Sequence, residues 1–211
     1  AQEWLERRPR TWYVDGEKGD DNNPGTERLP WKTIARGQTL YHIMSSQTGK
    51  AADGDTIIIK GGAEIRNYGN FIEDVGHRFK TTYRCEPAGT GELNIIDLGS
   101  KSTNLCFDGF KIPGYCDFVR ASGIDLLNSR IEFPGERFYA PAVSVNISRA
   151  RGINIQNCAI VNCQTAIEGS DSTDINIENN LLKGLLVDAI ELLRCNNVRL
   201  IGNHICELEH N

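Results

Sequence analysis

The chain has 211 residues with a formal net charge of −5, which is enough for one domain with a substantial core. A hydrophobic fraction of 39%, 21 glycines and a single methionine indicate a globular, turn-rich protein and disfavour a helical bundle. With a negative charge, no basic run and no apolar stretch near the roughly 18 residues of a membrane span, we expect neither nucleic acid nor a membrane as a partner.

Residues 1–53 are predicted to form a short strand, a polar loop and a capping helix. The strand is expected in TWYVD (11–15), and the loop that follows is rich in Asp, Gly and Asn. Pro30 then precedes a segment whose apolar residues share one helical face: Ile34, Leu40, Tyr41, Ile43 and Met44. Such a helix would cover one open end of the structure formed by residues 54–211.

Five segments of eight residues align without gaps in the second half of the chain. They are LCFDGFKI (105–112), IDLLNSRI (124–131), INIQNCAI (153–160), INIENNLL (175–182) and VRLIGNHI (198–205). Each has apolar residues at its first, third and eighth positions and Asn or Gly at its fifth. The alternation is typical of a strand with one buried face, and Asn and Gly tolerate a left-handed backbone, so each segment predicts strand, sharp turn, strand.

A third strand is expected before each of the last three segments, in SVN (144–146), AIE (166–168) and AIE (189–191). The last three segments begin at residues 153, 175 and 198, a spacing that matches one coil of a solenoid. The repeat therefore predicts a parallel solenoid with three strands in each coil. A leucine-rich horseshoe is disfavoured, because its leucine and asparagine signature and helix-like return are missing.

Stacking of these coils is expected to align side chains in columns. The middle residue of each third strand points inward, so alternation directs the next residue outward, which gives a column of Asn146, Glu168 and Glu191. The member before Asn146 is either Asp117 or Arg120, depending on where the shorter preceding coil has its gap. The sixth position of the segments forms a structural hydrogen-bond ladder of Ser129, Cys158, Asn180 and Asn203. A further column is expected to be a surface ion ladder of Arg149, Asp171 and Arg194.

The opening TWYVDGEKGDDNNPGTERLPWKTI (11–34) resembles that of many right-handed parallel β-helix proteins, including pectate lyases and the chondroitinase and alginate lyase group. GDTIIIKGG (54–62) resembles the first core strand of that group, and TTYRCEPAGTGELNIID (81–97) resembles its next strand, loop and strand. The resemblance implies an all-β, right-handed parallel β-helix with an N-terminal capping helix. It also implies a carbohydrate-active protein that is secreted, on the cell surface or part of a virion.

In the resembled family, the strand that carries Asn146, Glu168 and Glu191 forms the wall of the substrate groove. Amide and carboxylate oxygens suit Ca²⁺, and the set is similar in residue type to the calcium ligands of the chondroitinase and alginate lyase group. Calcium would neutralise a uronate carboxylate and acidify the proton alpha to it, as β-elimination requires. The expected function is therefore a polysaccharide lyase that cleaves an acidic, uronate-containing glycan.

Elimination also needs a base, which is usually Lys or Arg in these families. The candidates are Arg120, if it belongs to the column, Arg137 in the long loop 132–141, and Lys183, with Glu191 as a further catalytic candidate. Tyr139 and Asp188 are expected to contact the sugar. If the glycan is hydrolysed instead, the paired carboxylates would be Glu168 with Glu191 or Asp188 with Glu191. A non-catalytic, tailspike-like glycan-binding surface is the third hypothesis, and a plain acidic surface stripe needs no ligand.

Two further expectations concern the cysteines and the end of the chain. The seven cysteines are an odd number without CxxC pairs, so we predict mostly reduced, structural thiols. No cap follows the fifth segment, so we expect that further coils beyond residue 211 or another subunit cover this end of the solenoid.

Overall fold

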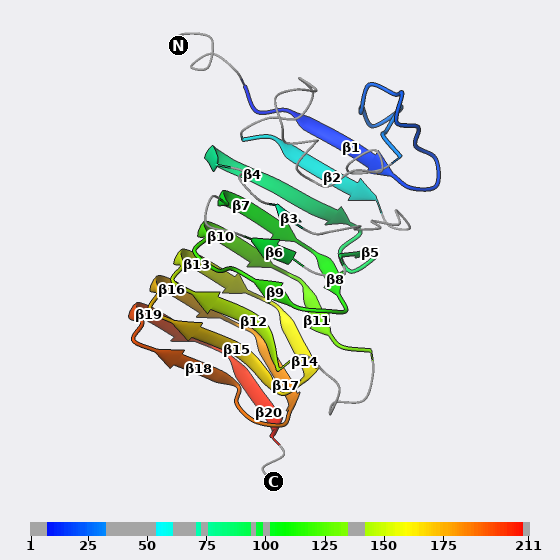
Figure 1. Ribbon diagram of the computed structural model, residues 1–211. Coiled ribbons are helices and arrows are strands. Elements are labelled where there is room, and N and C mark those ends of the chain that lie inside the picture. The colour runs from blue at the N-terminus through cyan, green and yellow to red at the C-terminus, as the bar shows by residue number, and fades with distance from the viewer. Residues whose placement is uncertain are drawn as a thin grey trace.

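The computed structural model describes residues 8–32, 54–60, 71–72, 76–93, 96–98, 102–134 and 142–208. These residues form twenty strands in three parallel sheets, and successive coils stack along one axis (Figure 1). No helix occurs among them, and therefore none that could cross a bilayer. The prediction of a parallel solenoid is confirmed. The predicted capping helix lies outside the described residues, and so do Arg137 and Tyr139.

From β4 (Gly76–Glu86) onwards each complete coil contributes one strand to each sheet. Sheet A consists of β1 (Thr11–Asp15), β2 (Thr56–Lys60), β4 (Gly76–Glu86), β7 (Thr103–Asp108), β10 (Ser122–Leu127), β13 (Arg151–Gln156), β16 (Thr173–Glu178) and β19 (Asn196–Ile201). Sheet B consists of β3 (Phe71–Ile72), β6 (Ile96–Leu98), β9 (Cys116–Asp117), β12 (Val143–Ser148), β15 (Thr165–Ser170) and β18 (Ile190–Leu193). Sheet C consists of β5 (Gly91–Glu92), β8 (Phe110–Ile112), β11 (Arg130–Glu132), β14 (Ala159–Cys163), β17 (Leu181–Leu185) and β20 (His204–Leu208).

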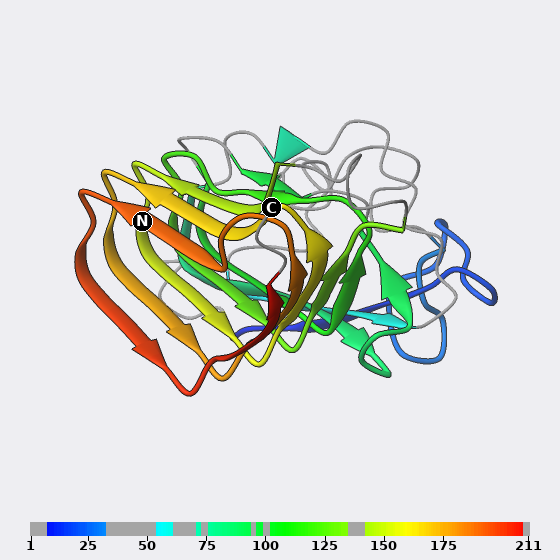
Figure 2. The same ribbon diagram turned by 90° about the horizontal axis from the view of Figure 1, so that it is seen from below.

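From β4 onwards the chain visits the sheets in a fixed order, from A to C to B and back to A, as Figure 2 shows along the stack. The corner between sheets A and C is sharp because one residue there adopts a left-handed backbone with φ between 49° and 82°. These residues occupy the fifth position of the five aligned segments: Gly109, Asn128, Asn157, Asn179 and Gly202. Asn and Gly adopt this conformation at low cost, which confirms the predicted strand, turn, strand reading.

The core consists of apolar side chains that stack in register from coil to coil. Leu126, Ile155 and Ile177 are successive partners in sheet A, and all three are fully buried. Towards the N-terminal end the same column becomes aromatic, with the rings of Tyr83 and Phe107 stacked at 5.7 Å between centroids. Each buried large side chain contributes about 1.5–3 kcal/mol relative to exposure, so a repeated column of this kind stabilises every coil.

A polar ladder also lies inside the corner between sheets A and C. The Asn180 side chain is 1% exposed, and its Oδ1 accepts a hydrogen bond from the backbone N of Cys158 at 2.8 Å. Its Nδ2 donates to the backbone oxygen of Ile155 at 2.9 Å and to Oδ1 of Asn203 at 3.0 Å. The ladder predicted at the sixth position of the segments is confirmed, and it connects three successive coils.

The seven cysteines are all free thiols, and five of them are buried. Cys116 and Cys163 are fully buried in the core among aliphatic side chains, where a small apolar residue packs well. This agrees with the prediction of reduced, structural cysteines.

The last described coil leaves apolar side chains exposed. Leu200, Ile205 and Leu208 are 51%, 43% and 42% exposed, although their register partners on the previous coil are buried in the core. No later strand covers them within the described part of the chain. The predicted cover for this end, whether further coils or another subunit, stays a prediction.

Candidate functional site

One column of polar side chains runs along the outer face of sheet B. Strand pairing places its members in register on five successive coils: Asp97, Asp117, Asn146, Glu168 and Glu191. All five side chains are partly exposed, and paired strands lie about 4.8 Å apart. We call this set the sheet B column. It carries four carboxylates and one amide in single file.

Alternation along the strands explains why these side chains point outward. Val145 and Ile167, which precede Asn146 and Glu168, are fully buried, so the next residue must face solvent. The three residues predicted to share one wall therefore do share it. The residue before Asn146 in the column is Asp117, because β9 ends there and Arg120 falls in the following turn with φ of 60°.

Glu168 and Glu191 are neighbouring carboxylates of the sheet B column. Among the described residues, neither carboxylate accepts a hydrogen bond or forms an ion pair. Five carboxylates on other faces and corners are paired with cations at 2.6–3.2 Å: Asp108 with Arg84, Asp125 with Lys80, Asp171 with Arg194, Asp174 with Arg151, and Glu178 with Arg199. Two adjacent, in-register carboxylates of sheet B are thus left open to a ligand.

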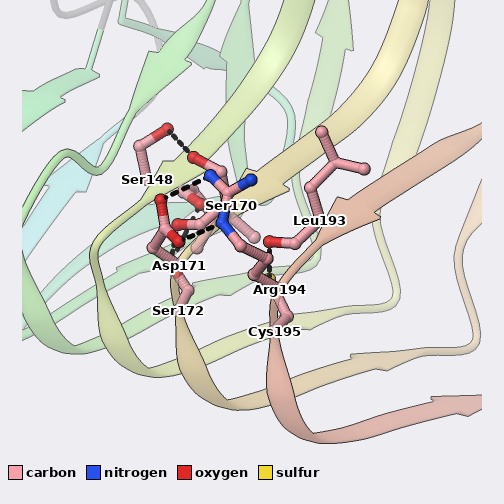
Figure 3. Close-up of polar contacts among 8 residues, drawn as sticks. Ser148, Ser170, Asp171, Ser172, Leu193, Arg194 and Cys195 are labelled. Atoms are coloured by element: carbon pink, nitrogen blue, oxygen red, sulfur yellow. Dashed lines mark hydrogen bonds and ion pairs between the residues drawn. The ribbon is translucent and has the colours of Figure 1, made fainter.

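The amide of Asn146 is held in a defined orientation. Its Nδ2 donates to Oδ1 of Asp117 at 3.2 Å, and its Oδ1 accepts a hydrogen bond from the Ser148 hydroxyl at 2.7 Å. Ser148 also accepts from the hydroxyl of Ser170 at 3.3 Å (Figure 3). An amide oxygen has two lone pairs, so that of Asn146 can accept one more interaction.

The oxygen donors of Asn146, Glu168 and Glu191 suit a hard cation. Calcium takes six to eight oxygen ligands and accepts irregular geometry. Within the described residues, no three His, Cys, Asp or Glu side chains gather as a closed metal site would require. Two carboxylates and one amide are fewer ligands than calcium takes, so a cation held by them would need water or a bound ligand to complete its coordination.

Asp117 is partly buried and lies between Asp97 and Asn146 in the column. Burial raises the pKa of its carboxyl, and the negative charge of Asp97 on the preceding coil raises it further. Hydrogen bonds from the backbone of Val119 and the side chain of Asn146 oppose this rise. The folded protein therefore disfavours the ionised form of Asp117, which is a cost of assembling the column.

The Asp117→Asn variant is expected to be more stable than the wild type at pH 7. A carboxyl with a raised folded-state pKa costs stability as the pH rises above its ordinary value of 3.8, and asparagine removes that cost while keeping an oxygen for Asn146. Urea unfolding at pH 7 and pH 3 measures the effect. The variant's advantage should be present at pH 7 and absent at pH 3, where the wild-type carboxyl is protonated in both states; an equal advantage at both values would contradict this reading.

The other predicted site residues within the described chain are not members of the column. Lys183 lies in β17 of sheet C, where its Nζ is 3.1 Å from Oε1 of Glu207. Asp188 is exposed three residues before Glu191, between β17 and β18. Arg120 lies in the turn between sheets B and A. Of the predicted catalytic residues within the described chain, only Glu191 belongs to the column.

Sequence reasoning missed Asp97. Its signal was available, because it stands eight residues before Leu105, much as Asn146 stands seven before Ile153, and follows an apolar residue of strand β6. Counting back from each segment of sheet A would have located it. The column is one member longer than predicted.

The comparisons with known proteins bear on the fold. The model of the family described as right-handed β-helix region matches residues 89–207. A solved structure named rhamnogalacturonan lyase aligns with 95% of this chain at 12% sequence identity and a TM-score of 0.34, and this chain spans 66% of that structure's length. No curated protein matches the sequence. Because the family model covers more than half of the chain, this protein belongs to the right-handed parallel β-helix family.

Proposed function

We propose that the outer wall of sheet B binds an acidic polysaccharide through a calcium ion held by Asn146, Glu168 and Glu191, and that the protein is a lyase that cleaves this glycan by β-elimination. The observation that supports the proposal is the pair of in-register carboxylates without a protein partner, next to an amide oxygen with a free lone pair.

Electrostatics favours a cation at this place. Two ionised carboxylates on neighbouring coils repel each other by about 3 kcal/mol at an effective dielectric of about 20, and by less than about 1 kcal/mol in full contact with water. No cationic side chain of the described residues pairs with Glu168 or Glu191. A divalent cation would neutralise these two carboxylates, and its open coordination positions could accept a carboxylate of an anionic polymer.

In β-elimination, the calcium ligands of the sheet B column and the base would have different roles. A calcium-bound uronate carboxylate has a more acidic alpha proton than a free one. Glu168, Glu191 and Asn146 would orient the sugar, while a base removes that proton and the glycosidic oxygen leaves as the carbon–carbon double bond forms. Of the predicted bases in the described chain, Arg120 borders sheet B, whereas Lys183 faces out from sheet C towards Glu207. Arg120 is therefore the base that we propose.

An assay on the wild-type protein tests the proposal. Alginate, pectate and chondroitin are incubated separately with the protein, and the absorbance of the unsaturated uronate product is followed with and without a chelator. We expect absorbance to rise with at least one polymer, to stop on chelation and to return when calcium is added in excess. New reducing ends without absorbance would indicate hydrolysis, and retention of a polymer without turnover would indicate binding alone.

Hydrolysis is a second candidate because of one geometric feature. Glu168 and Glu191 are register partners on strands about 4.8 Å apart, close to the 5–5.5 Å between the two carboxyl groups of retaining glycosidases. Such enzymes need different surroundings for the acid and the nucleophile. Glu168 and Glu191 are both partly exposed, and neither has a side-chain partner among the described residues. Their surroundings therefore favour a shared cation over a division of catalytic roles.

A further inference from the structure

The corner between sheets B and A carries a second row of charged side chains. One exposed residue on each of four successive coils has a left-handed backbone with φ between 51° and 60°: Arg120, Arg149, Asp171 and Arg194. Backbone hydrogen bonds align these positions, since the amides of Arg120 and Arg149 donate to the carbonyls of Ser148 and Ser170, each at 2.8 Å. We call this set the corner row. The arginines predicted as part of an ion ladder belong to it.

The residue type in the corner row is not explained by the backbone. The corner between sheets A and C has the same left-handed conformation, and it uses only Asn and Gly there. A long side chain with a β-carbon is strained at positive φ, whereas Gly is not and Asn is only slightly so. Three arginines in such positions cost folding free energy, and a local conformational cost of this kind points to a role for the side chain.

The charges of the corner row are unbalanced. Arg194 binds Asp171 in a bidentate ion pair, with Nε donating to Oδ1 at 2.6 Å and Nη2 to Oδ2 at 2.9 Å (Figure 3). This pair holds the pKa of Asp171 below its usual value, and the charge of Arg149 on the preceding coil lowers it further. Among the described residues, Arg149 and Arg120 form no ion pair and no side-chain hydrogen bond. The row therefore contains one carboxylate for three guanidinium groups.

The corner row runs parallel to the sheet B column. Each of its members follows a column member by three residues, which is about 10 Å along a strand. Ser148 and Ser170 each stand two residues after a column member and one residue before a corner-row member, and their hydroxyls share a hydrogen bond (Figure 3). A polymer lying along the stack would meet the column on one side, hydroxyls in the middle and guanidinium groups on the other side.

We propose that Arg149 is a second, calcium-independent binding site for a carboxylate of the acidic glycan. The carboxylate of Asp171, bound by the guanidinium of Arg194, shows how a carboxylate lies in the corner row. Arg120 and Arg149 lie on neighbouring coils of the same row and present guanidinium groups with no protein carboxylate between them. Arginine presents a rigid fork that matches a carboxylate with two parallel hydrogen bonds. The inference takes the acidic glycan from the proposed function, but it does not depend on calcium.

The test is glycan binding in the presence of a chelator, which removes the contribution of the sheet B column. Binding of pectate, alginate and chondroitin is measured at low salt for the wild type, Arg149→Asn and Arg130→Asn. Asparagine suits the left-handed backbone at position 149, so this variant is expected to fold with a melting temperature no lower than that of the wild type. Arg130 is a matched control, because it lies on sheet C and pairs with Glu132 at 2.6 Å.

We expect the wild type and Arg130→Asn to bind at least one of the polymers with chelator present, and Arg149→Asn to bind it about 10-fold more weakly, as for the loss of one charge-assisted hydrogen-bonded pair. Equal affinity of all three proteins, or no binding by the wild type, would overturn the inference. A chelator-resistant affinity that depends on Arg149 would support it even if calcium neither binds nor promotes turnover, so its outcome is separate from that of the proposed function.

Discussion

The Asn180→Ala variant is expected to lose about 3 kcal/mol of unfolding free energy. Its side chain satisfies the backbone N of Cys158, the backbone oxygen of Ile155 and the amide oxygen of Asn203 inside a corner that excludes water. Alanine would leave buried polar groups of two coils without partners, and each such group costs about 1–3 kcal/mol. Because each coil of a solenoid contacts only its neighbours, the loss falls on the interfaces on both sides of this coil. Urea unfolding followed by circular dichroism measures it.

The matched control is Asn154→Ala in sheet A. Asn154 also takes part in a side-chain hydrogen bond between coils, from Nδ2 of Asn176 at 2.9 Å, but it lies on the partly exposed outer face, where water can replace the lost partner. A surface substitution of this kind changes stability by about 0.5 kcal/mol or less. If the two variants unfolded at the same urea concentration, the buried ladder would contribute no more than an ordinary surface contact.

Much of the fold could be predicted from sequence because each coil repeats the same local rules. Ile153 and Ile155 alternate with polar residues, and Asn157 follows them. This pattern predicts a strand with one buried face that ends at a left-handed corner. Gapless alignment of such segments then gave the register of sheet A. Once the register is known, the alignment of Asn146, Glu168 and Glu191 follows from alternation alone.

The earlier coils were harder to interpret because they lack this regularity. Strand β9 has only two residues, Cys116–Asp117, and the turn after it carries Arg120, so counting along the chain left Asp117 and Arg120 equally placed. The choice depends on which of the two pairs with Asn146, and pairing between coils is a tertiary property. The N-terminal helix and the role of loop 132–141 stay predictions.

The sequence alone also does not predict which charged side chains form ion pairs with one another. Lys183 was a candidate base because it precedes Asp188 in the chain, yet alternation after the buried Leu182 turns it outward from sheet C, towards Glu207 of the next coil. That Glu168 and Glu191 have no partner depends on where every neighbouring cation goes. The repeat can align side chains, but only three-dimensional structure shows which of them are already satisfied.

The Glu168→Gln and Glu191→Gln variants are expected to bind calcium at least about 100-fold more weakly than the wild type, since each removes a charged ligand and leaves a neutral oxygen. Neither change should unfold the protein, because both carboxylates are partly exposed and have no partner among the described residues to lose. The control is Glu178→Gln on sheet A, whose carboxylate accepts hydrogen bonds from Gln156 at 2.8 Å and Arg199 at 3.2 Å.

Calorimetric titration of these proteins with calcium chloride tests most directly whether the sheet B column is a cation site. The wild type and Glu178→Gln should show the same calcium affinity, and Glu168→Gln and Glu191→Gln should show little or none. A wild type that takes up no calcium, or column variants that bind it as tightly as the wild type, would contradict the assignment of the sheet B column as a cation site.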